Sequence, residues 1–203
     1  KYATESLLKH FQTHSLKGFG IEDLHQGIVA AGAILHYLKD TEHPNLQHLT
    51  SIQRIDKEDY LWMDRFTVRN LELIHTSADQ GYSLHKTLGQ TVSPMGARLL
   101  KRWLLLPLID KSRIEERLEL VAYLIGQPDL RTQLSQKIKQ TGDIERLAAK
   151  IPLRKINPRD LIQIARGLQL TEQIRLISLA GTNDYLKRLA DSLNPSTNIR
   201  DKI

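Results

Sequence analysis

Two Glu-x-x-His pairs, Glu22 with His25 and Glu72 with His75, have a spacing that can bind metal ions. On a helix this spacing places a carboxylate and an imidazole on one face, and in helical bundles two such pairs ligate two metals. The site would also need two inward-facing glutamates from other helices, and the chain offers no obvious pair. We therefore predict no metal site, and a di-metal carboxylate bundle enzyme is kept only as an alternative.

Histidine, serine and glycine motifs give no second candidate. His10 and His14 share a helical face, but no third ligand is evident near them in the sequence. The chain has no G-x-S-x-G motif for a nucleophile. A phosphate-binding loop would need lysine after its second glycine, whereas the nearest approach, Gly27 to Gly32, is followed by Ala33. We predict neither a nucleophile nor an ATP site within these residues.

The segment "GDIERLAAK" places Asp143, Glu145 and Arg146 close together, as a catalytic cluster would. Asp143 is better explained as the N-cap of a helix, and Arg146 as the partner of a nearby acid. These positions would then fix a helix start rather than carry out a reaction. We predict no catalytic, cofactor-binding or metal-binding residue, and no enzymatic activity, for this chain.

Composition limits the class of protein. The 203 residues are 40% hydrophobic, enough for a substantial core, and carry a net charge of +6. A basic chain favours phosphate-rich partners, which is a weak indication of nucleic-acid contact. The absence of cysteine excludes disulfides and thiolate metal sites and fits a reducing compartment. Because no signal peptide or long apolar run occurs, we expect a cytoplasmic protein without membrane contact. The ends, Lys1 and "NIRDKI", suggest a piece excised from a longer polypeptide.

Hydrophobic periodicity predicts a mainly α fold with a multi-helix core and one small two-stranded β element. We interpret residues 1–20 as a linker that leads into a helical core formed by residues 21–203. Residues 49–64 read as the two-stranded ribbon, with the charged turn "KED" between its strands. Helices are predicted over residues 21–39, 65–73, 95–106, 110–126, 130–141, 144–151, 157–179 and 185–193.

Several residues have the chemistry of helix ends. Asp64 and Ser93 can each accept a hydrogen bond from a free amide in the first helical turn. Pro94 suits the first helical position because it has no amide hydrogen to satisfy. Pro107 should end the same helix, because the residue before a proline is driven toward an extended conformation.

The stretch "TVSPMGARLLKRWLLLPL" (residues 91–108) is apolar nearly all round when read as a helix. Such a helix must be covered on several sides, so we expect residues 95–106 to be enclosed by other helices and Trp103 to be buried. Gly96 at its start would let a neighbouring backbone come close. The helix would then be the central rod of a scaffold that moves as one unit.

Three cations, Arg98, Lys101 and Arg102, occupy one narrow sector of that helix. The simplest interpretation is a solvated edge, paired with acidic residues of the following helix. The alternative is a ridge that makes weak contacts with a DNA backbone, although no aromatic residues alternate with the charges to stack on bases.

Several segments resemble the core of the MutS family of bacterial DNA mismatch repair ATPases. They are "MDRFTVRNLEL" (63–73), "TVSPMGARLLKRWLLLPLID" (91–110), and "GDIERLAAKI" (142–151) followed by "NPRDL" (157–161). The segment "LKGFGIEDLHQGIVAAGAILHYLKDT" (16–41) is similar to the passage from the MutS connector domain into the core, so the resemblance spans nearly the whole chain. The chain departs from the family pattern at Gly89, where aspartate is common, and at Ser93, where threonine is more frequent.

The resemblance implies a complete protein that is a homodimer, encircles mismatched duplex DNA and uses ATP and magnesium to become a sliding clamp that recruits MutL. The family's mispair-reading Phe-x-Glu motif and its ATPase motifs are absent from this chain, and its clamp helices would follow residue 203. This piece would therefore hold no cofactor and would be a structural and allosteric scaffold between connector, DNA-binding clamp and ATPase. A stand-alone basic nucleic-acid-binding module is the alternative. We assign structural or coupling roles to Asp64, Asn70, Ser93, Pro94, Gly96, Trp103, Pro107, Gly142, Asp143 and Arg146.

Overall fold

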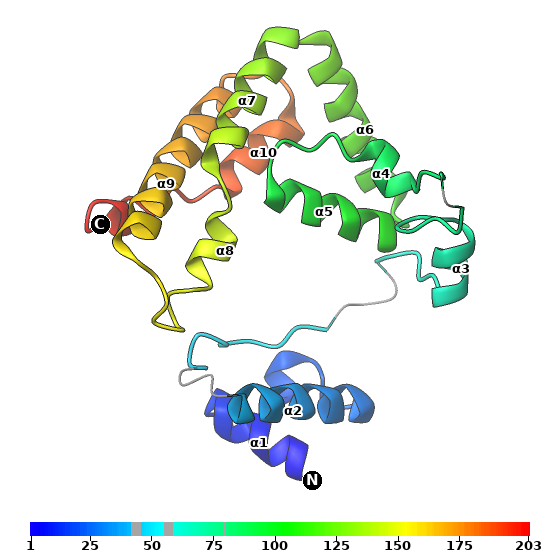
Figure 1. Cartoon of the computed structure of the whole chain (residues 1–203), viewed down its shortest axis with the longest axis vertical. Coiled ribbons are helices and arrows are strands. Elements are labelled where there is room, and N and C mark those ends of the chain that lie inside the picture. The colour runs from blue at the N-terminus through cyan, green and yellow to red at the C-terminus, as the bar shows by residue number, and fades with distance from the viewer. Residues whose placement is uncertain (42–45, 55–58, 79) are drawn as a thin grey trace. The chain divides into compact units, whose positions relative to one another are not determined.

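A computed structural model describes residues 1–41, 46–54, 59–78 and 80–203, and it is mainly helical (Figure 1). The predicted mainly α class is confirmed. The chain divides into two compact units. Unit 1 holds residues 1–56 and 149–156, and unit 2 holds residues 57–148 and 157–203.

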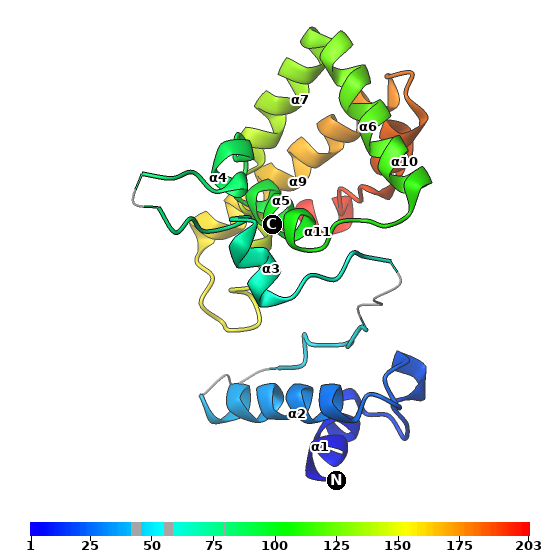
Figure 2. The same cartoon turned by 90° about the vertical axis from the view of Figure 1, so that its right-hand side faces the viewer.

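Unit 1 is built on two packed helices, α1 (Tyr2–Phe11) and α2 (His25–Asp40), with the short 3-10 helix η1 (Lys17–Phe19) between them in the chain. Figures 1 and 2 show α1 beside α2. The structure differs from the linker expected over residues 1–20, since α1 and η1 occupy this range and a division at residue 20 does not coincide with unit 1. The buried core of the unit consists of Leu7, Leu16, Ile21, Ile28, Leu35 and Leu46.

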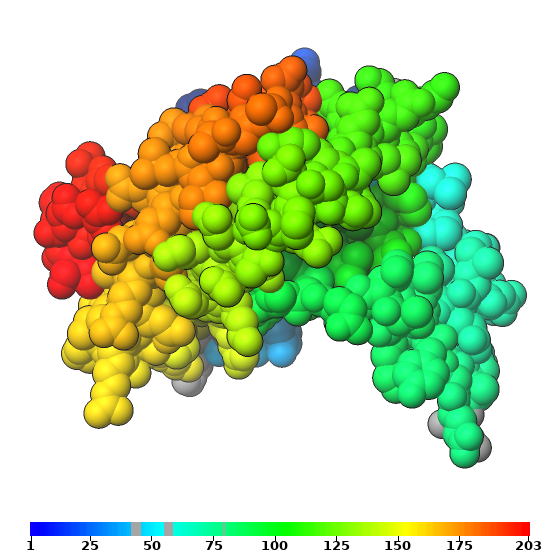
Figure 3. Space-filling view, turned by 90° about the horizontal axis from the view of Figure 1, so that it is seen from above, coloured from blue at the N-terminus to red at the C-terminus, as the bar shows by residue number. Residues whose placement is uncertain are grey.

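Unit 2 is organised around the long helix α9 (Pro158–Leu179), which packs against four other helices. Figure 3 shows α7 and the later part of α9 side by side on one face. The helices that contact α9 are α7 (Pro128–Thr141), α8 (Ile144–Ala148), α10 (Asp184–Ser192) and α11 (Thr197–Arg200). The remaining helices of the unit are α3 (Arg65–Asn70), α4 (Leu84–Leu88), α5 (Pro94–Leu105) and α6 (Lys111–Gly126).

Helix starts follow the side chains that the sequence analysis assigned to them. Asp64 Oδ1 accepts a hydrogen bond from Thr67 N at 2.7 Å, and Ser93 Oγ accepts one from Gly96 N at 3.1 Å. Both predicted N-caps are confirmed, and α5 ends before Pro107 as expected. Neighbouring residues alone determine these boundaries.

The predicted enclosure of α5 is wrong. None of its residues is buried, and Leu99 and Trp103 are 48% and 41% exposed. Leu100 and Leu104 are half-buried, so the helix has one covered side rather than several. Among the described residues the short α4 is its main helical neighbour, whereas an enclosed helix needs neighbours around most of its circumference. The central helix surrounded by other helices, as predicted for residues 95–106, is therefore not observed.

Replacing Trp103 by alanine is expected to cost about 1–2 kcal/mol of unfolding free energy, below the 3–5 kcal/mol typical of a buried tryptophan. The ring is partly protected, because the guanidinium carbon of Arg117 lies 3.8 Å from its centroid, a contact worth about 0.5–1 kcal/mol at an exposed site. Urea unfolding followed by circular dichroism measures the loss. A loss above about 4 kcal/mol would mean that the ring is enclosed.

The ribbon predicted within residues 49–64 is not found in the part of this segment that the structure describes. Lys57 and Glu58 of its expected turn lie outside the described residues. Tyr60 pairs instead with Leu108 in an isolated antiparallel bridge, and the amide of Leu61 donates to the carbonyl of Pro107 at 2.8 Å. The strand partner is therefore distant in the sequence, and residue alternation carries no information about such a partner.

Candidate functional site

The most extensive polar cluster of unit 2 joins α5 to the start of α8. We call it the Arg98 junction, and it consists of Arg98, Asp143 and Glu145. Arg98 donates two parallel hydrogen bonds to Asp143, from Nη1 to Oδ2 at 2.9 Å and from Nη2 to Oδ1 at 2.7 Å. It also donates to Glu145 Oε2, from Nη2 at 2.6 Å and from Nε at 3.1 Å. Bidentate arginine–carboxylate pairs fix orientation as well as distance, so the junction restricts how α5 meets α8.

Asp143 is also the N-cap of α8. Its Oδ1 accepts a hydrogen bond from Arg146 N at 3.2 Å, which confirms the predicted cap. The hydrogen bonds from Arg98, and to a lesser extent the Arg146 amide, hold the pKa of Asp143 below its usual value. Hydrogen bonds to Asp143 and Glu145 raise the pKa of Arg98 above its ordinary value. The ion pair is therefore fully charged at neutral pH.

Two glycines shape the turn that carries the junction. Gly142 has φ +74° and ψ −155°, a backbone conformation that is essentially restricted to glycine. Gly167 of α9 lies so close to this turn that a Cβ there would be 2.5 Å from Ile144 Cδ1 and 3.0 Å from the carbonyl oxygen of Thr141. Two features thus restrain the turn between α7 and α8: the glycine conformation at Gly142 and the close packing of the turn on α9 at Gly167.

Replacing Asp143 by asparagine is expected to lower stability at pH 6 by more than at pH 3. Asparagine keeps a capping oxygen but loses the charge. Because the folded-state pKa of Asp143 is depressed, its ionised form stabilises the fold above about pH 4, and this contribution is lost as the pH falls through the folded-state pKa. Urea midpoints of the parent and the variant at both pH values test this. If the variant loses the same stability relative to the parent at pH 6 and at pH 3, the charge of Asp143 is not the cause of the loss.

The partner predicted for the cationic sector is wrong. Arg98 pairs with the start of α8 and not with α6, the following helix. Lys101 and Arg102 are exposed, and in the described part of the chain neither forms an ion pair. The sector therefore separates into one fixed arginine and two solvated cations.

The other predicted site residues are dispersed. Asp64 and Asn70 lie at opposite ends of α3, and Pro107 belongs to the bridge region opposite Leu61. At the start of α5, the side chain of Ser93 caps the helix and Pro94 occupies its first turn. The structure thus brings Gly142, Asp143 and Arg146 together with Arg98, whereas Trp103 lies within α5 beneath Arg117. The close backbone approach predicted at Gly96 is not found among the described residues, because a Cβ there would meet only side-chain atoms of Ser93 and Thr91.

Sequence reasoning missed two contributors to the junction, Glu145 as an acceptor and Gly167 as the point of close approach. Glu145 follows the predicted cap closely, which was a usable signal. Gly167 lies in a continuous helical pattern, and its role depends on Ile144 and Thr141, which are far from it in the sequence.

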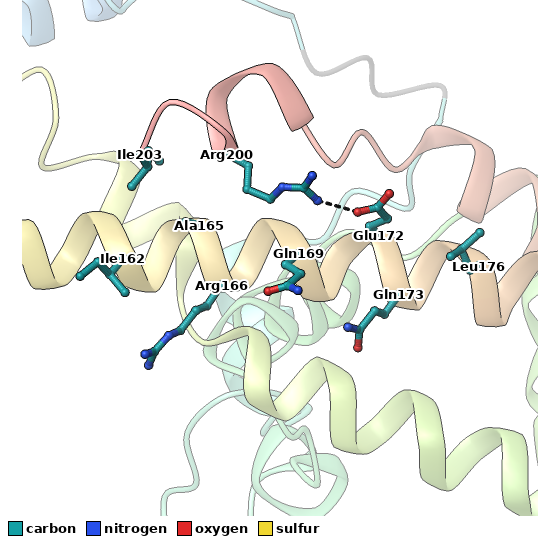
Figure 4. A pocket seen from close by; sticks show the side chains of 9 residues that line it. All are labelled: Ile162, Ala165, Arg166, Gln169, Glu172, Gln173, Leu176, Arg200 and Ile203. Carbon is teal, nitrogen blue, oxygen red and sulfur yellow. Dashed lines mark hydrogen bonds and ion pairs between the residues drawn. The ribbon is translucent and has the colours of Figure 1, made fainter.

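A second polar feature is a groove of about 590 Å³ along α9 and α11 (Figure 4). Arg200 Nη1 donates to Glu172 Oε2 at 2.6 Å, and Arg200 Nε donates to Asp201 Oδ1 at 2.9 Å. Figure 4 shows Arg166 directed away from the Arg200–Glu172 pair. Since Arg200 is neutralised by two carboxylates, the pair ties α11 to α9 and does not create a concentrated positive charge.

The two Glu-x-x-His glutamates have other partners. Glu72 Oε1 accepts hydrogen bonds from Thr76 Oγ1 at 3.1 Å and Ser77 N at 2.9 Å, and Glu22 lies 3.8 Å from Lys17 Nζ. Within residues 1–41, 46–54, 59–78 and 80–203, no group of three or more potential ligands is placed to hold a metal ion. Over the same residues, no helix combines the length and apolar character needed to span a membrane.

Both parts of the chain match known protein-family models. Residues 66–203, which hold the Arg98 junction, match the family model for MutS domain III, and residues 1–50 match the model for MutS domain II. The helical units are therefore of the class found in MutS proteins. The chain belongs to the MutS family, as the resemblance of its motifs implied.

Curated relatives support the same assignment. The chain is 46% identical over 202 residues to the DNA mismatch repair protein MutS of Christiangramia forsetii and to that of Flavobacterium johnsoniae. It is 44% identical over 202 residues to MutS of Cytophaga hutchinsonii. All of this chain is covered in each comparison, and it spans 23–24% of the length of these relatives.

Proposed function

We propose that this chain is the domain II and III part of a MutS-type mismatch repair polypeptide and acts in it as a mechanical coupling element without catalytic residues of its own. The complete polypeptide would bind mismatched duplex DNA as a homodimer, hydrolyse ATP with magnesium, form a sliding clamp and recruit MutL in the bacterial cytoplasm. The observation that carries the proposal is the family relationship along the whole chain.

Coupling between distant sites requires elements that have discrete arrangements and that both sites can bias. Because α5 is exposed, its burial cannot be what keeps these elements in a fixed arrangement. The Arg98 junction provides a different source, because four charge-assisted hydrogen bonds connect α5 to α8 and α8 packs on α9. A displacement of α5 would then either carry α8 with it or break the junction.

The test is Arg98→Gln in the complete polypeptide. Glutamine cannot form the bidentate pair, so the effect of mismatched DNA on ATP affinity should fall at least about threefold, while mismatch binding without ATP stays within about twofold of the parent. Arg102→Gln on the same helix is the matched control, since this exposed arginine has no ion pair in the described structure. A folded Arg98→Gln protein with parental coupling would refute the role of the junction.

Lys101 and Arg102 are exposed and form no ion pair with any described residue, which favours one second candidate, a module that binds nucleic acid by itself. A gel shift of the 203-residue chain with duplex DNA at several salt concentrations separates the two functions. The scaffold is expected to bind weakly. Tight binding that weakens steeply with salt, and that is lost in Lys101→Glu/Arg102→Glu, would favour the module.

A further inference from the structure

The most apolar stripe of α6 faces away from the rest of unit 2. Ile114, Leu118, Val121 and Ile125, which we call the α6 stripe, are 36%, 61%, 55% and 64% exposed. Scattered exposed apolar residues are common on protein surfaces, but a continuous run on one helix face is not.

The opposite side of α6 makes the internal contacts, through the half-buried Leu120 and Leu124 and through polar groups. Glu116 Oε1 accepts from Arg188 Nη2 of α10 at 2.5 Å, and Tyr123 Oη accepts from the amide of Thr182 at 3.1 Å. Arg117 lies over the Trp103 ring. The helix is thus apolar on both sides. Because such a helix is normally covered on both, the exposed α6 stripe indicates a second contact outside this unit.

The spacing of the stripe specifies the shape of what can cover it. Successive members are separated by four, three and four residues, which is the repeat that forms a straight seam along a helix. Such a seam accepts the ridge of another helix along its length. A globular side chain or a small ligand would cover only one or two of the four residues.

We propose that the α6 stripe binds an amphipathic helix contributed by the part of the MutS-type polypeptide that lies outside these 203 residues, an inference that rests on the proposed function. The relatives hold more than three quarters of their length outside the matched region. An interface between separate molecules usually needs about 20–30 residues on each side, far more than this seam. Tethering in one polypeptide supplies the effective concentration that lets a small surface stay occupied.

Charge defines the occupant further. Glu115 and Glu119 follow one edge of the stripe on successive turns. Glu115 lies 3.5 Å from Lys111 Nζ, and Glu119 has no ion pair in the described part of the chain. The docking helix therefore carries apolar residues at intervals of three and four and lysine or arginine along the edge that faces Glu119.

The test uses the absence of cysteine from this chain. Leu118→Cys places a thiol in the middle of the stripe, and Ser112→Cys places one at an exposed position on another face of α6. Each variant is made both in the 203-residue chain and in the complete polypeptide. Alkylation by iodoacetamide is followed at the modified peptide by mass spectrometry, so thiols elsewhere in the polypeptide do not interfere.

The thiol at position 118 is expected to react freely in the 203-residue chain and about tenfold or more slowly in the complete polypeptide. The thiol at position 112 should react at similar rates in both. Equal rates at position 118 in the two proteins would overturn the proposal. The proposal would also be overturned if alkylation at position 118 of the 203-residue chain slowed as the protein concentration rose. A second copy of the chain would then be what covers the stripe. The alkylation measurement needs neither DNA nor ATP. Its result can therefore be interpreted even if the Arg98→Gln experiment shows that the chain has no coupling role.

Discussion

Replacing Gly32 by alanine is expected to destabilise unit 1 by about 3 kcal/mol, although alanine is the better helix former by about 1 kcal/mol. A Cβ at Gly32 would lie 2.5 Å from Cβ and 2.8 Å from Cα of Ala3. Because one of these is a backbone atom, a rotamer change cannot relieve the clash. Helix α1 would have to move away from α2, and the core between them would lose its close packing.

Gly27→Ala on the same helix is the matched control. Its Cβ would meet only Leu24 Cβ at 3.4 Å, so this variant should be stabilised by about 0.5 kcal/mol. Hydrogen exchange of the α1 and α2 amides is the suitable measurement, because both tryptophans, Trp62 and Trp103, lie in unit 2 and their fluorescence does not report on unit 1. If these amides exchange no faster in Gly32→Ala than in the parent, the close approach of the helices is refuted.

Local features of the fold could be predicted from the sequence because they depend on neighbouring residues. Asp64, Ser93 and Asp143 cap helices through amides three residues further along the chain, and each was identified correctly. The helices missed were α1, α4 and α11. Of these, α4 has only five residues and α11 four, too few for a hydrophobic period to emerge.

Burial could not be predicted in the same way. Apolar periodicity identifies the face of a helix that seeks a partner, but it does not say whether the partner belongs to the same unit. On α5 and α6 the residues that the pattern would place in a core, such as Leu99, Trp103 and Leu118, are exposed. The periodicity therefore identifies the apolar faces of α5 and α6, but the burial expected for them is not observed within the described residues.

The candidate site shows the same limit. The cap function of Asp143 is local, whereas its pairing with Arg98 connects positions that are 45 residues apart. Arg98 has acidic residues of α6 nearer in the sequence, and no feature of the sequence distinguishes them from Asp143 and Glu145. Geometry decides the pairing, because the α8 start presents both carboxylates to one guanidinium.

Replacing Gly167 by alanine is expected to destabilise unit 2 by about 2–3 kcal/mol, because the added Cβ would overlap Ile144 Cδ1 at 2.5 Å and Cγ1 at 2.7 Å. The overlap falls on the start of α8, so relief by moving α8 would also disturb the Arg98 junction. Gly126→Ala is the control, since a Cβ there meets no atom within 4 Å and should change stability by less than about 0.5 kcal/mol. Tryptophan fluorescence during urea unfolding reports on this unit.

A double-mutant cycle with Ile144→Ala identifies the cause of the loss. Most of the overlap at Gly167 involves the end of the Ile144 side chain, and only the Thr141 carbonyl oxygen, at 3.0 Å from the added Cβ, would remain once that side chain is shortened. In the Ile144→Ala background, Gly167→Ala should therefore cost at least about 1 kcal/mol less than in the parent. Additive losses would show that the overlap with Ile144 is not what Gly167 avoids, and the close packing of α9 on the α7–α8 turn would then lose its role in holding the junction.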